Sequence, residues 1–226
     1  TLEAGNGEEA LEKLKDNEVD VIVTDVMMPV MNGIKLCKNV KQNIRTCHIP
    51  VIILSAKTDI KDQMEGLQMG ADDYIPKPFS LAILTTKIQN MMRTRSRMLD
   101  KYAKSLEVEP EKITFNAMDE ALLKRAMAIV EKNMDNIEFS TDEFAREMNM
   151  SRSNLHLKLK AITGESTIDF IRKIRFNEAA KLLKDGRYTV AEVSTMVGFN
   201  TPSYFATSFK KYFGCLPTEY IKKSKG

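Results

Sequence analysis

Three side chains in the first third of the chain could together accept and hold a phosphoryl group: Asp25, Ser55 and Lys77. An ionised carboxylate is a weak nucleophile, but it can take a phosphoryl group when cations offset the charge that develops. The Lys77 ammonium is such a cation, and the Ser55 hydroxyl can donate a hydrogen bond to a phosphate oxygen. On its own, Asp25 is equally well explained as a cap of the turn before Pro29. The three residues therefore indicate phosphoryl chemistry only if the fold brings them together.

Each of the three residues follows a segment whose composition predicts a buried strand. These segments are residues 19–24, 51–54 and 73–76. Chemistry in open parallel sheets gathers at the carboxyl ends of the strands, since those ends share one edge. We therefore expect the Asp25 carboxylate, the Ser55 hydroxyl and the Lys77 ammonium to meet at one edge of a parallel sheet.

This spacing resembles the receiver domain of two-component response regulators, and the run Gly70–Phe79 is close to that family's consensus. The resemblance implies an α/β fold, a flavodoxin-like parallel sheet with strand order 2-1-3-4-5. It also implies a Lys–Pro bond that is often cis. Four residues take roles from the family: phosphoacceptor Asp25, switch hydroxyl Ser55, switch aromatic Tyr74 and invariant lysine Lys77.

One departure from the family concerns the divalent metal. Receiver domains carry a pair of acidic residues at the end of their first strand, but residues 1–10 resemble the end of the second strand and the start of the second helix. The first strand and helix are thus absent from this sequence, as in a fragment. The resemblance implies Mg²⁺ in the intact receiver, held at Asp25 and Met27 only together with the missing pair. Because Asp25 alone cannot ligate Mg²⁺, we expect this chain by itself to bind none and to be phosphorylated poorly.

Length and composition predict two modest domains without membrane contact. The chain has 226 residues, more than a usual single domain, and no apolar run approaches the roughly 20 residues of a membrane span. Its 3 cysteines include no CxxC pair, which favours a reducing compartment over a disulfide framework. We therefore expect a cytoplasmic protein.

The domain boundary is predicted from a long helix and the break that follows it. Residues 80–104 have helical spacing, with one apolar face that comprises Leu81, Leu84, Ile88 and Met91. Pro110 and a charged run then interrupt the pattern, as is common between domains. We predict a receiver at 1–104 with an extended last helix, a linker at 105–118, and a second domain at 119–226.

Charge is distributed unevenly between these domains. Residues 1–79 carry 9 Lys and Arg against 13 Asp and Glu, whereas residues 151–226 carry 14 against 6, a net charge of +8. A basic domain of this kind favours a polyanionic partner. Basic runs are also common as solvated surfaces, so charge alone does not decide the partner.

An internal repeat gives the second domain a more specific interpretation. The segment that begins at Phe144 recurs at Val193, at an offset of 49 before the turn and 50 after it. Each copy predicts a short helix, a tight turn, an N-capping Ser or Thr and a second helix. The copies therefore predict an all-α domain with two helix-turn-helix motifs.

The second helix of each copy has a narrow apolar stripe at about 100° per residue. The buried stripes are predicted to comprise Leu155, Leu159 and Ile162 in the first copy and Phe205, Phe209 and Tyr212 in the second. The opposite faces and their basic flanks could enter a major groove. The candidate DNA-binding residues are Arg152, Ser153, His156, Leu157, Lys160, Ser203, Ala206, Thr207, Lys210 and Lys211.

Three of these candidates carry open alternatives. Leu157 and Ala206 could touch a thymine methyl, although an exposed Leu is unremarkable. His156 is better explained as a donor to a base or phosphate than as a metal ligand, because the other His of the chain, His48, lies in the other domain.

A helix predicted at Thr167–Lys184, about 27 Å long, could hold two recognition helices near 34 Å apart, one turn of B-DNA. Together with the repeated segments, residues 119–223 resemble the DNA-binding domain of the AraC family. The resemblance implies that the second helix of each motif contacts bases and the flanking basic residues contact phosphates. Leu157 and Thr207 stand where many members have arginine, so the target sequence cannot be inferred.

The two resemblances together predict a phosphorylation-controlled transcription regulator and not an enzyme. Its expected partners are double-stranded DNA, a histidine kinase domain in the same or a separate chain, and a second copy after activation. This domain order also occurs at the end of hybrid sensor kinases, and the sequence leaves hybrid and stand-alone forms open. An alternative is a phosphoryl relay or sink whose basic domain docks a protein partner.

Overall fold

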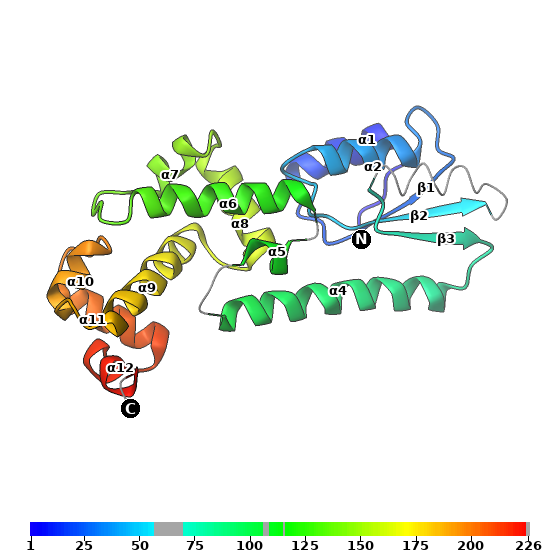
Figure 1. The fold of residues 1–226 in the computed structure, drawn as a ribbon. Coiled ribbons are helices and arrows are strands. Elements are labelled where there is room, and N and C mark those ends of the chain that lie inside the picture. Colours follow the sequence, from blue (N-terminus) through cyan, green and yellow to red (C-terminus); the bar gives the residue numbers. More distant parts are fainter. Residues whose placement is uncertain (57–69, 106–108, 115, 225–226) are drawn as a thin grey trace. The chain divides into compact units, whose positions relative to one another are not determined.

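The computed structural model describes residues 1–56, 70–105, 109–114 and 116–224 (Figure 1). The chain divides into two compact units. Unit 1 comprises Thr1–Asp100 and Thr114–Asp119, and unit 2 comprises Lys101–Ile113 and Glu120–Gly226. The predicted linker at 105–118 stays a prediction.

Unit 1 is built on a parallel sheet of the strands β1 (Ile22–Asp25), β2 (Val51–Ala56) and β3 (Asp73–Lys77), in that order. The register places Asp25 opposite Leu54, and Lys77 opposite Ala56. The middle strand is buried along Val51, Ile52 and Ile53, as expected for a parallel strand covered on both faces. The predicted α/β class is confirmed, although β1 starts at Ile22, three residues after the apolar run begins.

Helices cover both faces of this sheet (Figure 1). The helices α1 (Gly7–Asp16) and α2 (Gly33–Gln42) lie on one face, and their first turns are capped by the side chains of Asn6 and Asn32. The long helix α4 (Leu81–Lys104) lies along the other face. The predicted apolar face of α4 is correct from Leu84 onward, but Leu81 is 75% exposed.

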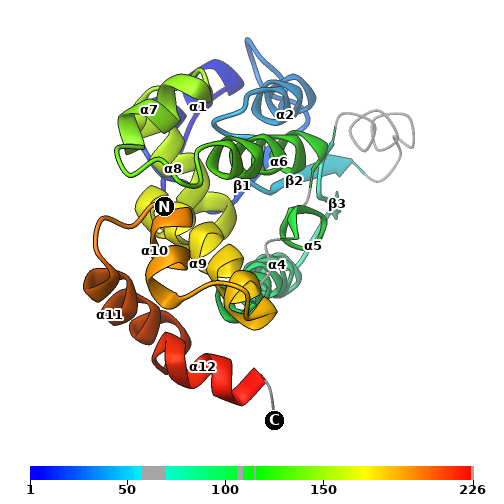
Figure 2. The same cartoon turned by 60° about the vertical axis from the view of Figure 1, so that its left-hand side comes forward.

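Unit 2 is helical, as the repeat predicted (Figure 2). Its helices are α5 (Pro110–Ile113), α6 (Ala117–Lys132, whose first three residues belong to unit 1), α7 (Thr141–Glu147), α8 (Arg152–Thr163), α9 (Thr167–Asp185), α10 (Val190–Met196), α11 (Pro202–Phe213) and α12 (Pro217–Ser224). The pairs α7–α8 and α10–α11 are the two helix-turn-helix motifs. The central helix α9 corresponds to the helix predicted at Thr167–Lys184.

The repeat in sequence becomes a repeat in local structure. A capping box opens the first helix of each motif, at Ser140 in α7 and at Thr189 in α10. The second helices of the motifs, α8 and α11, are capped by Ser151 and Thr201. Both of these helices end at a glycine in the left-handed conformation, with φ of 76° at Gly164 and 74° at Gly214.

The predicted apolar stripes form the cores of the two motifs. Leu155, Leu159 and Ile162 are buried, as are Phe205 and Phe209, whereas Tyr212 is only half-buried. Around the second motif the rings of Phe176, Phe199 and Phe205 pack with centroids between 5.2 and 6.3 Å apart. No helix within the described residues is long and apolar enough to cross a bilayer.

The last turn of α4 packs inside unit 2, where it meets a buried lysine. The Lys173 ammonium donates to the Tyr102 carbonyl at 2.6 Å and lies 3.5 Å from the centre of the Tyr102 ring. It also pairs with the Glu165 carboxylate at 3.1 Å, and the Tyr102 hydroxyl donates to the same carboxylate at 3.1 Å. Burial raises the pKa of Tyr102 and of Glu165 and lowers the pKa of Lys173. Since Glu165 directly follows the C-cap of α8, this cluster links the last turn of α4 and α9 to the end of α8.

Candidate functional site

The first candidate site lies at the carboxyl edge of the sheet in unit 1. Asp25 ends β1 and Lys77 ends β3, and their side chains form an ion pair across the end of β2. The backbone N–H of Met27 donates to the second Asp25 oxygen at 3.2 Å. The Asp25 side chain is 34% exposed. The carboxylate is therefore held by a cation while it remains open to solvent.

Ser55 completes this edge from the middle strand. It is 1% exposed and lies opposite Pro76, one residue before Lys77. Its hydroxyl has no hydrogen-bond partner in the part of the chain that the structure describes. A buried hydroxyl without a partner is destabilising, so such a group calls for an explanation in function. A phosphate oxygen on Asp25 would be an acceptor at this edge of the sheet.

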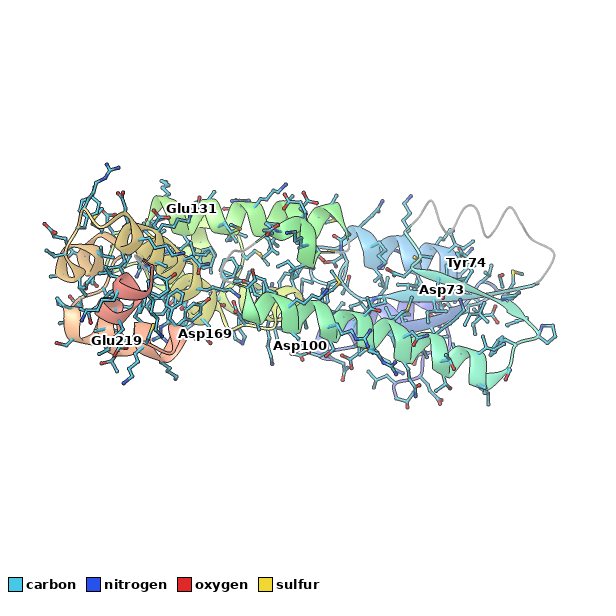
Figure 3. The ribbon with its side chains drawn as sticks, turned by 60° about the horizontal axis from the view of Figure 1, so that its bottom comes forward. Asp73, Tyr74, Asp100, Glu131, Asp169 and Glu219 are labelled. Carbon is cyan, nitrogen blue, oxygen red and sulfur yellow. The ribbon has the colours of Figure 1, made fainter. Side chains whose placement is uncertain are left out.

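Tyr74 and Asp73, labelled in Figure 3, are successive residues of β3 and therefore face opposite sides of the sheet. Asp73 forms an ion pair with Lys87 of α4 at 2.6 Å. Tyr74 packs on the other side, against the apolar cluster shared by α2 and the strands. The predicted switch aromatic is thus half-buried, on the face of the sheet opposite α4.

The turn after β1 shows constraints that the sequence patterns did not reveal. A Cβ at Gly33 would lie 2.1 Å from the Asp25 carbonyl oxygen, so only glycine fits there. The Gly33 amide donates to the Val26 carbonyl at 3.1 Å, which closes the turn. Val30 has a φ of 64°, a strained conformation for a β-branched residue. The Lys77–Pro78 bond is cis, as the family resemblance implied.

The described residues by themselves do not fit a magnesium site. Within them, no three His, Cys, Asp or Glu side chains gather closely enough to hold a metal ion. Asp25 is paired with Lys77, and the Met27 amide donates to the Asp25 carboxylate, so neither contact supplies a further oxygen ligand.

The second candidate site comprises the outer faces of α8 and α11. All ten predicted DNA-binding residues lie on these two helices, and none of them is buried. His156 and Ala206 are half-buried, and the other eight are exposed. The His156 Nδ1 lies 3.5 Å from the Thr167 hydroxyl at the start of α9.

Several structural residues of this domain were missed from the sequence. Lys158 on α8 is buried rather than exposed, unlike Lys160 two residues later. Arg172 of α9 donates to the hydroxyl of Tyr204 on α11 at 2.9 Å. Helical periodicity indicates which face of a helix is buried, but it does not indicate which polar groups bond across two helices. Arg172 therefore carried no signal in the sequence.

Comparison with known proteins assigns each unit to a family. Residues 1–89 match the response regulator receiver domain, and residues 144–223 match a helix-turn-helix domain. The chain is 39% identical to Histidine kinase P4 of Formosa agariphila over 219 residues, which is 97% of this chain but 16% of that protein. It is 43% identical to Response regulator ArlR of Staphylococcus saprophyticus over 88 residues, 39% of each chain. The chain thus spans well under half of either relative.

One solved structure that resembles this chain is the C-terminal domain of AraT, a response regulator from Geobacillus stearothermophilus. It has a TM-score of 0.43 and 30% identity, over 45% of this chain and 84% of that chain. The chain joins a response regulator receiver domain to a helix-turn-helix DNA-binding domain of the AraC type.

Proposed function

We propose that this chain is the receiver and output part of a two-component transcription regulator, in which phosphorylation of Asp25 controls DNA binding through α8 and α11. The observation that carries the proposal is the convergence of Asp25, Ser55 and Lys77 at one sheet edge, in a chain that also has two helix-turn-helix motifs. The first feature accepts a signal, and the second supplies its output.

The phosphoryl transfer uses the groups at the end of the sheet. An Asp25 oxygen forms a bond to phosphorus while the bond from phosphorus to the donor imidazole nitrogen breaks, and the electron pair stays on that nitrogen. The Lys77 ammonium and the Met27 amide, which contact the carboxylate, stabilise the charge that builds on the oxygens. The donor is a histidine kinase domain, and the relative named Histidine kinase P4 favours one within the same polypeptide.

The acyl phosphate changes the charge at this edge. It adds roughly one negative charge and new acceptor oxygens, to which Ser55 donates the hydrogen bond that it lacks among the described residues. Tyr74 packs against the core cluster that contains Ile53, two residues before Ser55 on β2, and it changes rotamer as Ser55 moves. The altered receiver surface then favours association of two copies on DNA.

The output is DNA binding by two recognition helices. Lys160, Lys210 and Lys211 are exposed on α8 and α11, and they neutralise phosphates. His156 and the small hydroxyl residues Ser153, Ser203 and Thr207 contact base edges. Two motifs joined by the single helix α9 contact two successive major-groove segments.

Phosphorylation is tested in the full-length protein with phosphoramidate, measured as intact mass. Wild type gains one phosphoryl group, Asp25→Asn gains none, and Lys77→Ala is labelled about 100-fold more slowly because a stabilising cation is lost. Retained labelling of Asp25→Asn would place the phosphoacceptor elsewhere. The mass of the native assembly with and without label reports whether two copies associate.

DNA binding is tested by selection from random duplexes followed by mobility shift. Lys210→Ala weakens binding to all sequences and lowers the slope of log affinity against log salt by about 1, whereas His156→Ala changes base preference. Lys181→Ala, exposed on α9, is the control. If both variants bind like wild type, the groove assignment is wrong. If wild type selects no duplex, the relay or sink alternative takes its place.

A further inference from the structure

Arg175, in the middle of α9, is a buried arginine that binds backbone carbonyls instead of a carboxylate. It is 8% exposed. Its Nη1 donates to the Gly198 carbonyl at 2.9 Å, and its Nη2 donates to the carbonyls of Asn136 at 2.7 Å and Asn133 at 3.2 Å. One guanidinium therefore binds three carbonyls from two segments that are far from it in sequence.

One of these two segments lies in the second helix-turn-helix motif, and the other leads into the first. Gly198 forms the turn between α10 and α11 in the second motif. Asn133 and Asn136 lie in the loop between α6 and α7, which leads into the first motif, and the Asn133 amide also donates to Glu147 of α7 at 3.1 Å. Figure 2 shows α9 between the pairs α7–α8 and α10–α11. Arg175 thus links the turn of one motif to the segment that positions the other.

The link is tight at its Gly198 end. Gly198 has a φ of 72°, and a Cβ there would lie 2.6 Å from the Met134 carbonyl oxygen and 2.7 Å from the Arg175 Cζ. The turn of the second motif therefore lies directly against the α6–α7 loop and the guanidinium. No side chain could be added at this position without separating them.

Arginine suits this task because of its geometry. The guanidinium is planar and presents five donors in a rigid fork, whereas an ammonium is a point charge on a flexible stem. Buried ionic groups often contribute little net stability compared with apolar residues, and their best-attested role is to select one arrangement over others. Three carbonyl bonds to one planar group restrict both the distance and the angle between the segments that they join.

We infer that Arg175 is a positioning residue for DNA recognition, which holds the two recognition helices in one relative orientation and so restricts the protein to one spacing of DNA half-sites. The inference rests on the proposed DNA binding. Without the Arg175 link, α9 still joins the motifs covalently and their separate cores remain, but the second motif can rotate. A rotating motif tolerates half-sites that are out of register.

The experiment measures spacing tolerance with the full-length protein. The two half-sites found by selection are placed at the selected spacing and at spacings one to three base pairs longer or shorter. Wild type is expected to lose at least about tenfold in affinity when the second site rotates out of phase with the roughly 10-base-pair turn. Arg175→Met, which keeps the volume and removes the donors, should reduce this loss to about two- or threefold. Lys181→Met on the same helix should discriminate like wild type.

Folding and half-site binding separate a positioning role from general damage. Arg175→Met should retain wild-type affinity for DNA with one half-site and a wild-type circular dichroism spectrum. If Arg175→Met does not fold, Arg175→Lys replaces it, because a lysine ammonium cannot reproduce the planar fork. Its affinity is then measured at the same half-site spacings. The inference is wrong if a folded Arg175 variant loses as much affinity as wild type when the half-site spacing changes. It is also wrong if the affinity of wild type does not depend on the half-site spacing. A wild type that selects no DNA overturns the proposed function instead.

Discussion

Replacement of Lys173 by Met is expected to destabilise unit 2 far more than a surface lysine replacement. The Lys173 side chain is 1% exposed, and that of its partner Glu165 is 19% exposed. Loss of one member of a buried pair leaves the other charge unpaired, at a cost of about 3 to 5 kcal/mol. The variant also loses the charged hydrogen bond to the Tyr102 carbonyl. We expect a decrease of about 3 to 5 kcal/mol in the free energy of unfolding of unit 2.

A double-mutant cycle tests the origin of this decrease. The pKa of Glu165 is raised by burial, and the pKa of Lys173 is lowered by burial, so near neutral pH the fold disfavours both charged forms. A carboxylate whose pKa is higher in the folded than in the unfolded state reduces stability at pH values above its unfolded pKa. A lysine whose pKa is lower in the folded state reduces stability at pH values below its unfolded pKa. The double variant Lys173→Met with Glu165→Gln removes both costs. The free energy of unfolding of the double variant should lie within about 2 kcal/mol of that of wild type. The coupling energy between positions 173 and 165 should then be at least about 2 kcal/mol.

Urea denaturation followed by far-UV circular dichroism measures these values, with separate transitions fitted for the two units. The matched control is Lys181→Met on the same helix, which breaks the exposed Lys181–Glu178 pair at 3.2 Å. Exposed pairs contribute at most about 1 kcal/mol, so the control should change little. Additive single variants, or a Lys173→Met that unfolds like the control, would refute the argument.

Two further predictions concern unit 1. Gly33→Ala should lower the free energy of unfolding by at least about 2 kcal/mol, because its Cβ would lie 2.1 Å from the Asp25 carbonyl oxygen. The control in thermal unfolding is Gly5→Ala, where the nearest atom is a flexible side-chain oxygen at 3.4 Å. Equal melting temperatures for the two variants would contradict the prediction. Burial raises the pKa of Cys37 from its ordinary 9.0 to about 11. Its contribution to stability is therefore complete below pH 9 and falls by up to about 3 kcal/mol towards pH 11, at about 1.4 kcal/mol per pH unit. Cys37→Ala should remove this fall in the free energy of unfolding between pH 9 and 11, measured by urea titrations at several pH values. If the fall is unchanged in the variant, it arises from other groups.

Local patterns in the sequence predicted many of the elements and their buried faces, although Leu81 and Tyr212 are more exposed than predicted. The continuous apolar run Val51–Leu54 predicted a buried strand, and helical periodicity predicted Leu155 and Leu159 in the core. The edge at Asp25 and Lys77 was predictable because parallel strands deliver their last residues to one place. The roles of the individual residues at that edge remain predictions.

Buried charges were the part that the sequence could not predict. Arg175 and Lys173 both lie on α9, where a charged residue normally indicates a solvated face. Apart from Glu165, eight residues from Lys173, their acceptors lie 23 to 71 residues away, such as the carbonyls of Gly198 and Tyr102. No periodicity within a helix encodes such partners, because they are set by how helices pack against one another.

The two motifs share a sequence pattern but differ at their turns. Asn149, at φ of 56°, occupies the first turn and is exposed, whereas Gly198 occupies the second and is buried against the Met134 carbonyl. The first turn is therefore exposed to solvent, although its positive φ favours asparagine or glycine. The second turn is an internal joint that admits no side chain. Of these two turns built on one sequence pattern, the first can therefore offer a side chain to another molecule, whereas the second holds the domain together.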